Sequence, residues 1–279
     1  MLKRIVTGAV LALILVPALI FYNTIITPLL WAVIASVSLY ETARCVKADK
    51  MRGVTLLICV FAAAFPFVQY TIGWSSETTG AEMIPALLSV AFFAVFLLYA
   101  AGVFGLTKAK LSSSSQLVLM LIYTTAASVS IVATTQAAYG GFLLPMVFIG
   151  SWITDSFAYF CGSFFGKHKL IPEISPKKTV EGSVGGTLFC CLFCAAYGFI
   201  IASVTELSVN YISLMLSGLV LSVVSQIGDL NASYLKRTYG IKDFGNIFPG
   251  HGGMLDRFDS VIAAAPFLYI LSRFFTYFS

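Results

Sequence analysis

The sequence predicts an all-α polytopic membrane protein. Its 279 residues are 59% hydrophobic and only 10% charged, and the mean hydropathy is +0.93. A soluble domain carries about 25% charged residues, so this chain has too few polar side chains to cover a surface in water. Apolar runs recur along the whole sequence, and a helix of about 20 apolar residues spans the hydrocarbon core of a bilayer. The lipid bilayer is therefore the first partner that the sequence indicates.

About nine transmembrane helices are expected. The first apolar run follows Lys3 and Arg4, as in a signal peptide. It is longer than a usual signal-peptide core and no small-x-small cleavage site stands out, so we interpret it as an uncleaved helix. The predicted helices cover residues 5–22, 25–43, 54–73, 84–104, 117–137, 142–162, 184–204, 211–229 and 258–277.

The loops predict the orientation. Sixteen of the 17 Lys and Arg residues fall in the N-terminal segment or in every second loop, and only Arg273 falls toward the other side. The alternate loops carry Glu77, Glu82 and Glu206 but no Lys or Arg. The positive-inside rule then places the N-terminus and the basic loops in the cytoplasm and the C-terminus outside. Because the net charge of +5 is spread over short loops, nucleic acid is not an expected partner.

Two regions are expected to differ in role. Residues 1–140 have short loops and are predicted to form a scaffold of transmembrane helices. Residues 141–279 are predicted to form a catalytic membrane domain, with long polar cytoplasmic loops at 163–183 and 230–257. In membrane proteins, irregular polar backbone beside a helix bundle is where function concentrates. The Cys-x-x-Cys at Cys191 lies within an apolar run, which indicates helix packing rather than redox chemistry.

The densest charge lies between Gln226 and Asp259. Asp229 is expected to end the eighth helix, and Asp256 and Asp259 to open the ninth on one helical face. Two or three carboxylates converging at a helix end suit a hard cation, and proteins bind Mg²⁺ through one or two carboxylates plus substrate phosphates. Basic side chains around them would bind phosphate oxygens. A solvated loop of paired charges is the alternative. The further candidates in this stretch are Ser233, Lys236, Arg237, Lys242, Asp243, His251, Gly252, Gly253 and Arg257.

The 163–183 loop and Asp155 are also candidates. Lysines of the loop could neutralise phosphates, and backbone N–H groups at the start of the next helix favour anions. An ordinary positive-inside loop is the alternative. Asp155 interrupts an apolar run, so it either faces a polar cavity and helps to hold a cation or ligand, or it snorkels to the membrane surface or pairs with a base. The candidates in the loop are Ser175, Lys177, Lys178, Thr179 and Glu181.

At these residues the sequence resembles the phosphatidate cytidylyltransferase family, whose members are also called CDP-diacylglycerol synthases. The family pattern is S-x-x-K-R, K-D four residues later, and then H-G-G-x-x-D-R-x-D. Two upstream stretches are also similar to the family: S-P-x-K-T-x-E-G from Ser175 and D-x-x-A-Y-x-x-G from Asp155. Val180 departs from the aromatic residue expected in many members, and the clear resemblance covers about a quarter of the chain. The matching residues of the main pattern are Ser233, Lys236, Arg237, Lys242, Asp243, His251, Gly252, Gly253, Asp256, Arg257 and Asp259.

The resemblance implies a reaction in which CTP and phosphatidic acid give CDP-diacylglycerol and pyrophosphate. It implies Mg²⁺ as cofactor, with K⁺ as a candidate second cation. Asp229 and Asp256 would be the metal carboxylates with Asp259 close by, and their replacement by Ala is expected to abolish turnover while leaving folding largely intact. It also implies an enzyme in the plasma (inner) membrane with a cytoplasmic active site, and a homodimer is a candidate assembly. The alternatives are another membrane phosphotransferase or kinase that uses CTP or lipids, and an ion-coupled transporter.

Overall fold

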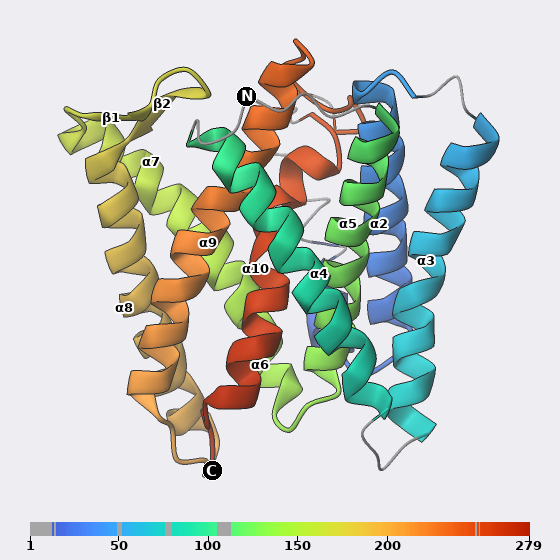
Figure 1. The fold of residues 1–279 in the computed structure, drawn as a ribbon. Helices are drawn as coiled ribbons and strands as arrows, with labels where there is room; N and C mark the ends of the chain where they lie inside the picture. The colour runs from blue at the N-terminus through green and yellow to red at the C-terminus, as the bar shows by residue number, and fades with distance from the viewer. Residues whose placement is uncertain are drawn as a thin grey trace.

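The fold is a bundle of long helices with one short β-hairpin at one end (Figure 1). The computed structural model describes residues 13, 15–48, 52–75, 80–104, 113–248, 250 and 252–279. The elements are α2 (Ile26–Cys45), α3 (Arg52–Ser75), α4 (Gly80–Val103), α5 (Ser113–Thr135), α6 (Gly140–Phe148), the π-helix η1 (Ile149–Ile153), α7 (Thr154–Phe165), β1 (Lys169–Ile171), β2 (Ser175–Thr179), α8 (Val180–Val204), α9 (Tyr211–Thr238) and α10 (Leu255–Phe274).

The helices alternate in direction along the bundle. The hairpin, the end of α2 and the C-terminal end of α9 lie at one end of the molecule, and the C-terminus lies at the other (Figure 1). The last residues are tied to the connection between α8 and α9, because the backbone N–H groups of Ser208 and Asn210 donate to the carbonyls of Ser279 and Tyr277 at 2.8 and 2.9 Å. This arrangement agrees with the predicted alternation of basic and non-basic loops, while the side of the membrane that each end faces stays a prediction.

Six of the described helices are long and apolar enough to cross a membrane. They are Ile26–Cys45, Arg52–Gly73, Ser113–Thr135, Gly140–Phe165, Val180–Val204 and Tyr211–Thr238. A shorter apolar helix covers Leu87–Ala100, and α10 carries four charged residues within its 20 positions. These helices are compatible with the predicted all-α polytopic membrane fold. The count of nine stays a prediction, since most of the expected 5–22 helix lies outside the described residues.

Most predicted boundaries shift by a few residues, and three of the differences bear on the site. The expected 142–162 helix runs from Gly140 to Phe165 and contains a π-helical turn. The 163–183 segment is not only loop, because β1 and β2 pair antiparallel and α8 begins at Val180. The predicted helix end at Asp229 is wrong, since α9 continues to Thr238. Leu230 and Leu235 are buried in this extension, which gives the polar sequence an apolar helical face.

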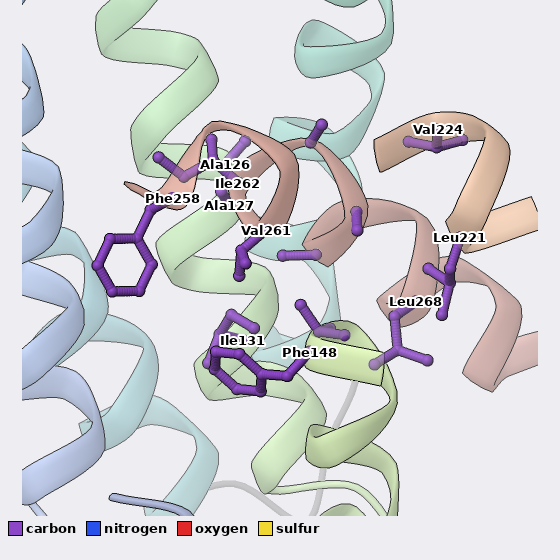
Figure 2. Close-up of a cluster of buried hydrophobic side chains, with 14 of the residues drawn as sticks. Ala126, Ala127, Ile131, Phe148, Leu221, Val224, Phe258, Val261, Ile262 and Leu268 are labelled. Atoms are coloured by element: carbon purple, nitrogen blue, oxygen red, sulfur yellow. The ribbon is translucent and has the colours of Figure 1, made fainter. Parts of the chain in front are cut away.

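α10 lies at the centre of the bundle and carries much of the core. Side chains from α5, α6, α9 and α10 point toward one another in this core (Figure 2). On α10 itself, Val261, Ile262 and Leu268 are at most 1% exposed. Because the helix is packed on all sides, the position of its first turns is fixed, and these turns carry Asp256 and Asp259. The labelled members of the cluster are Ala126, Ala127, Ile131, Phe148, Leu221, Val224, Phe258, Val261, Ile262 and Leu268.

Candidate active site

The hairpin delivers one basic side chain to a carboxylate of α9. Lys178, on β2, places its Nζ 2.6 Å from Oδ2 of Asp229, and the same Nζ approaches the carbonyl of Gln226 at 3.5 Å. The two side chains of the pair are 23% and 28% exposed, so water still reaches this contact. Burial disfavours the charged amine, but the Asp229 carboxylate more than offsets it and raises the pKa of Lys178. Lys178 is therefore a cation at neutral pH, held beside a carboxylate that the sequence singled out.

A second, more buried pair joins α9 to α10. Nζ of Lys236 lies 2.7 Å from Oδ1 of Asp256, and these side chains are 11% and 3% exposed. The other oxygen of Asp256, Oδ2, accepts hydrogen bonds from the backbone N–H groups of Phe244 and Gly253 at 2.8 and 2.9 Å. Asp256 thus binds the loop between α9 and α10 as well as Lys236. Replacing it by Ala is expected to cost stability, which corrects the expectation that folding would be largely unaffected.

A third carboxylate group lies where α7 meets α10. Oδ1 of Asp259 accepts the backbone N–H of Ser260 at 2.8 Å, and the hydroxyl of Ser260 donates to Oδ2 of Asp155 at 3.2 Å. Asp155 stands directly after the π-helical turn, which shifts the helix register and turns this residue toward α10. Of the two interpretations of Asp155, the contact with Ser260 favours a side chain directed into the bundle.

Arg257 adds a cation with spare hydrogen-bonding capacity. Its Nε is buried and has no hydrogen-bond partner among the described residues. Its charge lies close enough to influence Asp155 and Asp229. A buried guanidinium donor without a partner is costly, so native proteins usually supply one. A phosphate oxygen is the acceptor that a guanidinium suits best, because the fork can bind it in a bidentate manner.

The carboxylates suit Mg²⁺ as partial ligands. In the described part of the chain, no three His, Cys, Asp or Glu side chains are arranged to hold a metal ion by themselves. Asp155, Asp229 and Asp259 nevertheless lie close enough for their charges to act on one another. Among the described residues, no hydrogen-bond donor reaches Oδ1 of Asp229 or Oδ2 of Asp259. Two free carboxylate oxygens fit Mg²⁺, which takes one or two carboxylates and completes its shell with phosphates and water.

Several predicted residues have structural partners instead. The hydroxyl of Thr179 caps α8 by accepting the N–H of Gly182 at 3.2 Å. Glu181 accepts from the backbone N–H of His168 and lies 2.6 Å from its Nδ1, which closes the base of the hairpin. Arg237 donates to the carbonyl of Ile174 at 3.3 Å and so ties α9 to the hairpin turn. These contacts give the three residues roles in holding the hairpin.

The remaining predicted residues form no hydrogen bond or ion pair with the charged pairs in the described part of the chain. Lys177, Lys242 and Asp243 are exposed, Ser175 pairs with Ile171 across the hairpin, and Ser233 is half-buried on α9. His251 lies outside the described residues. Gly252 has a left-handed φ of +85°, and a Cβ there would come within 2.7 Å of Oδ2 of Asp256. That glycine is required by the turn and by the neighbouring carboxylate.

Sequence reasoning missed two residues that shape the site. Ser260 bridges Asp155 and Asp259, although a serine beside an aspartate carries little signal. Glu41 on α2 accepts the backbone N–H groups of Met254 and Leu255, both at 2.9 Å. A carboxylate inside the predicted 25–43 helix was the available signal, because a buried charge in an apolar helix needs partners.

Comparison with known proteins places the chain in a family. The model of the Cytidylyltransferase family matches residues 2–275, which is nearly the whole chain. The chain belongs to this family. Among curated relatives, a phosphatidate cytidylyltransferase of Bacillus subtilis (strain 168) is 52% identical over 125 residues, which is 45% of each chain. The enzymes of that name from Staphylococcus haemolyticus and Aquifex aeolicus are 46% identical over 124 residues and 45% identical over 130 residues.

These matches to single relatives cover only part of each protein. The Staphylococcus match spans 44% of this chain and 46% of the relative, and the Aquifex match spans 47% and 46%. The chain thus matches a little under half the length of the curated relatives. The resemblance seen in the S-x-x-K-R and H-G-G patterns is confirmed at the level of the cytidylyltransferase family.

Proposed function

We propose that this protein transfers the cytidylyl group of CTP to phosphatidic acid, giving CDP-diacylglycerol and pyrophosphate. One observation carries the proposal: two lysine–aspartate pairs and an arginine Nε with no partner among the described residues lie together at one end of an apolar bundle. Such an arrangement is costly in a membrane protein unless it binds a charged ligand. Membership of the cytidylyltransferase family and the names of the relatives identify CTP and a lipid phosphate as the best candidates.

In this reaction an oxygen of the lipid phosphate attacks the α-phosphorus of CTP. The bond from that phosphorus to the oxygen bridging the α- and β-phosphates breaks, and pyrophosphate leaves. The attacking oxygen is already an anion, so no general base is required. The protein's task is to position the two phosphates and to offset their charge.

The basic residues have distinct parts in this proposal. Arg257 would bind a phosphate oxygen through its Nε, which has no partner among the described residues. Lys178 and Lys236 would offset phosphate charge while holding Asp229 and Asp256 in place. Asp229 and Asp259 would hold Mg²⁺ through their free oxygens, with K⁺ as a candidate second cation. This pair replaces the predicted pair of Asp229 and Asp256, because both oxygens of Asp256 already have partners in Lys236 and the loop before α10. When bound, Mg²⁺ supplies further neutralisation of the phosphate charge.

The membrane setting is part of the same proposal. The basic end of the bundle, which carries the site, would face the cytoplasm from the plasma membrane, with the N-terminus inside and the C-terminus outside. CTP would then reach the site from water and the lipid from the bilayer. A homodimer and the absence of nucleic-acid binding stay predictions from the sequence.

The test is pyrophosphate release by the purified protein in detergent. Release is expected only when CTP, Mg²⁺ and phosphatidic acid are all present, and dropping any one of them should reduce it to background. Release of a nucleoside diphosphate instead would indicate a lipid kinase. Ion flux in liposomes without CTP consumption would indicate a transporter. Folded protein that releases no pyrophosphate from the complete mixture would contradict the proposal.

A further inference from the structure

Glu41 joins the predicted scaffold to the start of α10. It lies on α2 and is only 2% exposed. Its two carboxylate oxygens accept separate backbone N–H groups, Oε1 from Met254 and Oε2 from Leu255, each at 2.9 Å. These N–H groups belong to the residue that precedes α10 and to its first residue. A helix start has N–H groups without intrahelical partners, and Met254 itself provides no side-chain cap. Glu41 therefore caps α10 from another helix.

Two glycines leave room for this carboxylate. A Cβ added at Gly245 or at Gly253 would come within 2.3 Å of Oε1 of Glu41, too close for any real contact. Gly253 is one of the predicted site residues, and the group that approaches it here is a carboxylate of the protein. The shape of the loop between α9 and α10 thus depends on Glu41, just as the turn at Gly252 depends on Asp256.

The two carboxylates bind neighbouring backbone groups of the same loop. Asp256 binds the N–H groups of Phe244 and Gly253, and Glu41 binds those of Met254 and Leu255. Between them they bind four backbone donors around the first turn of α10. The start of α10 carries Asp259 and Arg257, to which the proposed function gives Mg²⁺ and phosphate, together with Asp256. A small rotation of the turn would move all of them relative to Asp229.

We propose that Glu41 is a positioning residue for the site: it fixes the first turn of α10 so that Asp256, Arg257 and Asp259 face Asp229. The chemical consequence rests on the proposed function. Groups that orient metal ligands without touching the metal typically change metal affinity or activity by about 10–100-fold when mutated. A residue that only stabilised the fold would lower the melting temperature without altering the Mg²⁺ dependence of the folded fraction.

The test uses Glu41→Gln in the full chain. The amide keeps the shape of the side chain, but its NH₂ group would face a backbone N–H, so one of the two hydrogen bonds is lost. Glu206→Gln, an exposed carboxylate in the connection between α8 and α9, is the matched control. A second variant, Gly245→Ala, pushes on the Glu41 carboxylate without altering it.

The first readout is independent of catalysis. Hydrogen exchange of a peptide covering residues 253–258 is expected to speed up by about tenfold or more in Glu41→Gln and in Gly245→Ala, and not in Glu206→Gln. The second readout is the Mg²⁺ concentration for half-maximal pyrophosphate release, expected to rise about tenfold in the same two variants. If the two changes act through one contact, the double variant should be little worse than either single variant.

The outcomes separate this inference from the proposed function. Wild-type exchange in both variants would overturn the claim that Glu41 fixes the turn, whatever the enzyme activity. A second outcome is faster hydrogen exchange while the rate of pyrophosphate release per folded molecule and its Mg²⁺ dependence stay unchanged. That result would make Glu41 a helix cap only and overturn the positioning role. If Glu41→Gln fails to fold, Gly245→Ala decides both points. Wild-type protein that lacks the activity would count against the proposed function, while hydrogen exchange would still test the hold on α10.

Discussion

The outer helix α3 is apolar and mostly exposed on the surface of the bundle, whereas the central helix α10 carries charged residues and is mostly buried. In water-soluble proteins the apolar helix would be the buried one. Only 17% of the membrane-length part of α3 is buried in the bundle, and Leu57 on it is 68% exposed. In α10, 13 of 20 residues are buried although its first turn carries Asp256, Arg257 and Asp259. Lipid tails are as apolar as leucine, so apolar side chains gain nothing from moving inside. Polar groups do gain, because only other protein groups can satisfy them there.

This comparison explains where the site lies. Charges that would be costly in lipid gather around the start of α10. α2 and α7 bring carboxylates that accept hydrogen bonds from α10. α9 brings Lys236 to Asp256, and the hairpin brings Lys178 to the neighbouring Asp229 of α9. The outer helices supply the apolar surface toward the bilayer. Substitutions near the start of α10 should therefore have large effects, and equivalent changes on the outer helices small ones.

The largest effect on stability is expected from breaking the buried pair with Lys236→Met. This change leaves Asp256 charged and unpaired, and removing one partner of a buried pair typically costs about 3–5 kcal/mol. Lys178→Met should cost less, because the Lys178–Asp229 pair is more exposed. Thermal unfolding can be followed by a thiol-reactive dye, since Cys190 and Cys194 are buried and free.

A second variant sharpens that test. Lys236→Met combined with Asp256→Leu removes both charges, and well-packed apolar residues often replace a buried pair without loss of stability. The double variant should melt at a higher temperature than Lys236→Met but below the wild type, because the loop N–H groups bonded to Asp256 lose their acceptor. Pyrophosphate release should not return. If Lys236→Met melts at the wild-type temperature, the charges at the start of α10 do not contribute more to stability than the outer helices.

A smaller effect on stability is expected when an isoleucine is shortened to alanine at a buried and at an exposed position. Ile262→Ala on α10 empties a site that is 1% exposed, and such changes typically cost about 2–5 kcal/mol. Ile200→Ala on α8 removes the same atoms from a side chain that is 58% exposed, where surface changes usually stay within about 0.5 kcal/mol. Melting temperatures of the two variants in one detergent provide the measurement. Equal losses would mean that α8 is not an outer helix.

The smallest effect concerns the close approach of α9 and α10. A Cβ at Gly228 would come within 2.2 Å of Cβ of Ala263, so Gly228→Ala forces the two helices apart. Overpacking of this kind typically costs about 1–3 kcal/mol. Gly53→Ala on α3 meets no atom within 4 Å and should raise stability slightly, by about 0.5–1 kcal/mol, because Ala favours helix. The melting temperature should fall in Gly228→Ala and rise in Gly53→Ala.

The sequence predicted the membrane class and most of the charged residues of the site, because these depend on composition and local spacing. Asp256 and Asp259 share the start of one helix, as predicted. Lys178 was predicted only as a phosphate-binding candidate, and its contact with Asp229 was not predicted. The end of α9 was misplaced because a helix that leaves the apolar layer keeps its hydrogen bonds while losing its hydrophobic signal. A hydropathy pattern detects only the apolar part of such a helix.

The partners of the charges could not be predicted in the same way. The contact between Glu41 and Leu255 joins residues 214 positions apart, and it depends on how α2 packs beside α10. The hairpin in the 163–183 segment depends similarly on pairing between two strands of three and five residues, too short for a periodic pattern. Tertiary packing decides both features.

The central claim is that the charges around the start of α10 perform chemistry while the outer helices only face lipid. The most direct measurement is CTP- and phosphatidic-acid-dependent pyrophosphate release by Asp229→Asn and by Leu57→Ala, at equal amounts of folded protein. We expect Asp229→Asn to lose more than about 100-fold, because it removes a free oxygen for Mg²⁺ and the partner of Lys178. Leu57→Ala should keep the wild-type rate. A wild-type rate in Asp229→Asn would contradict the account.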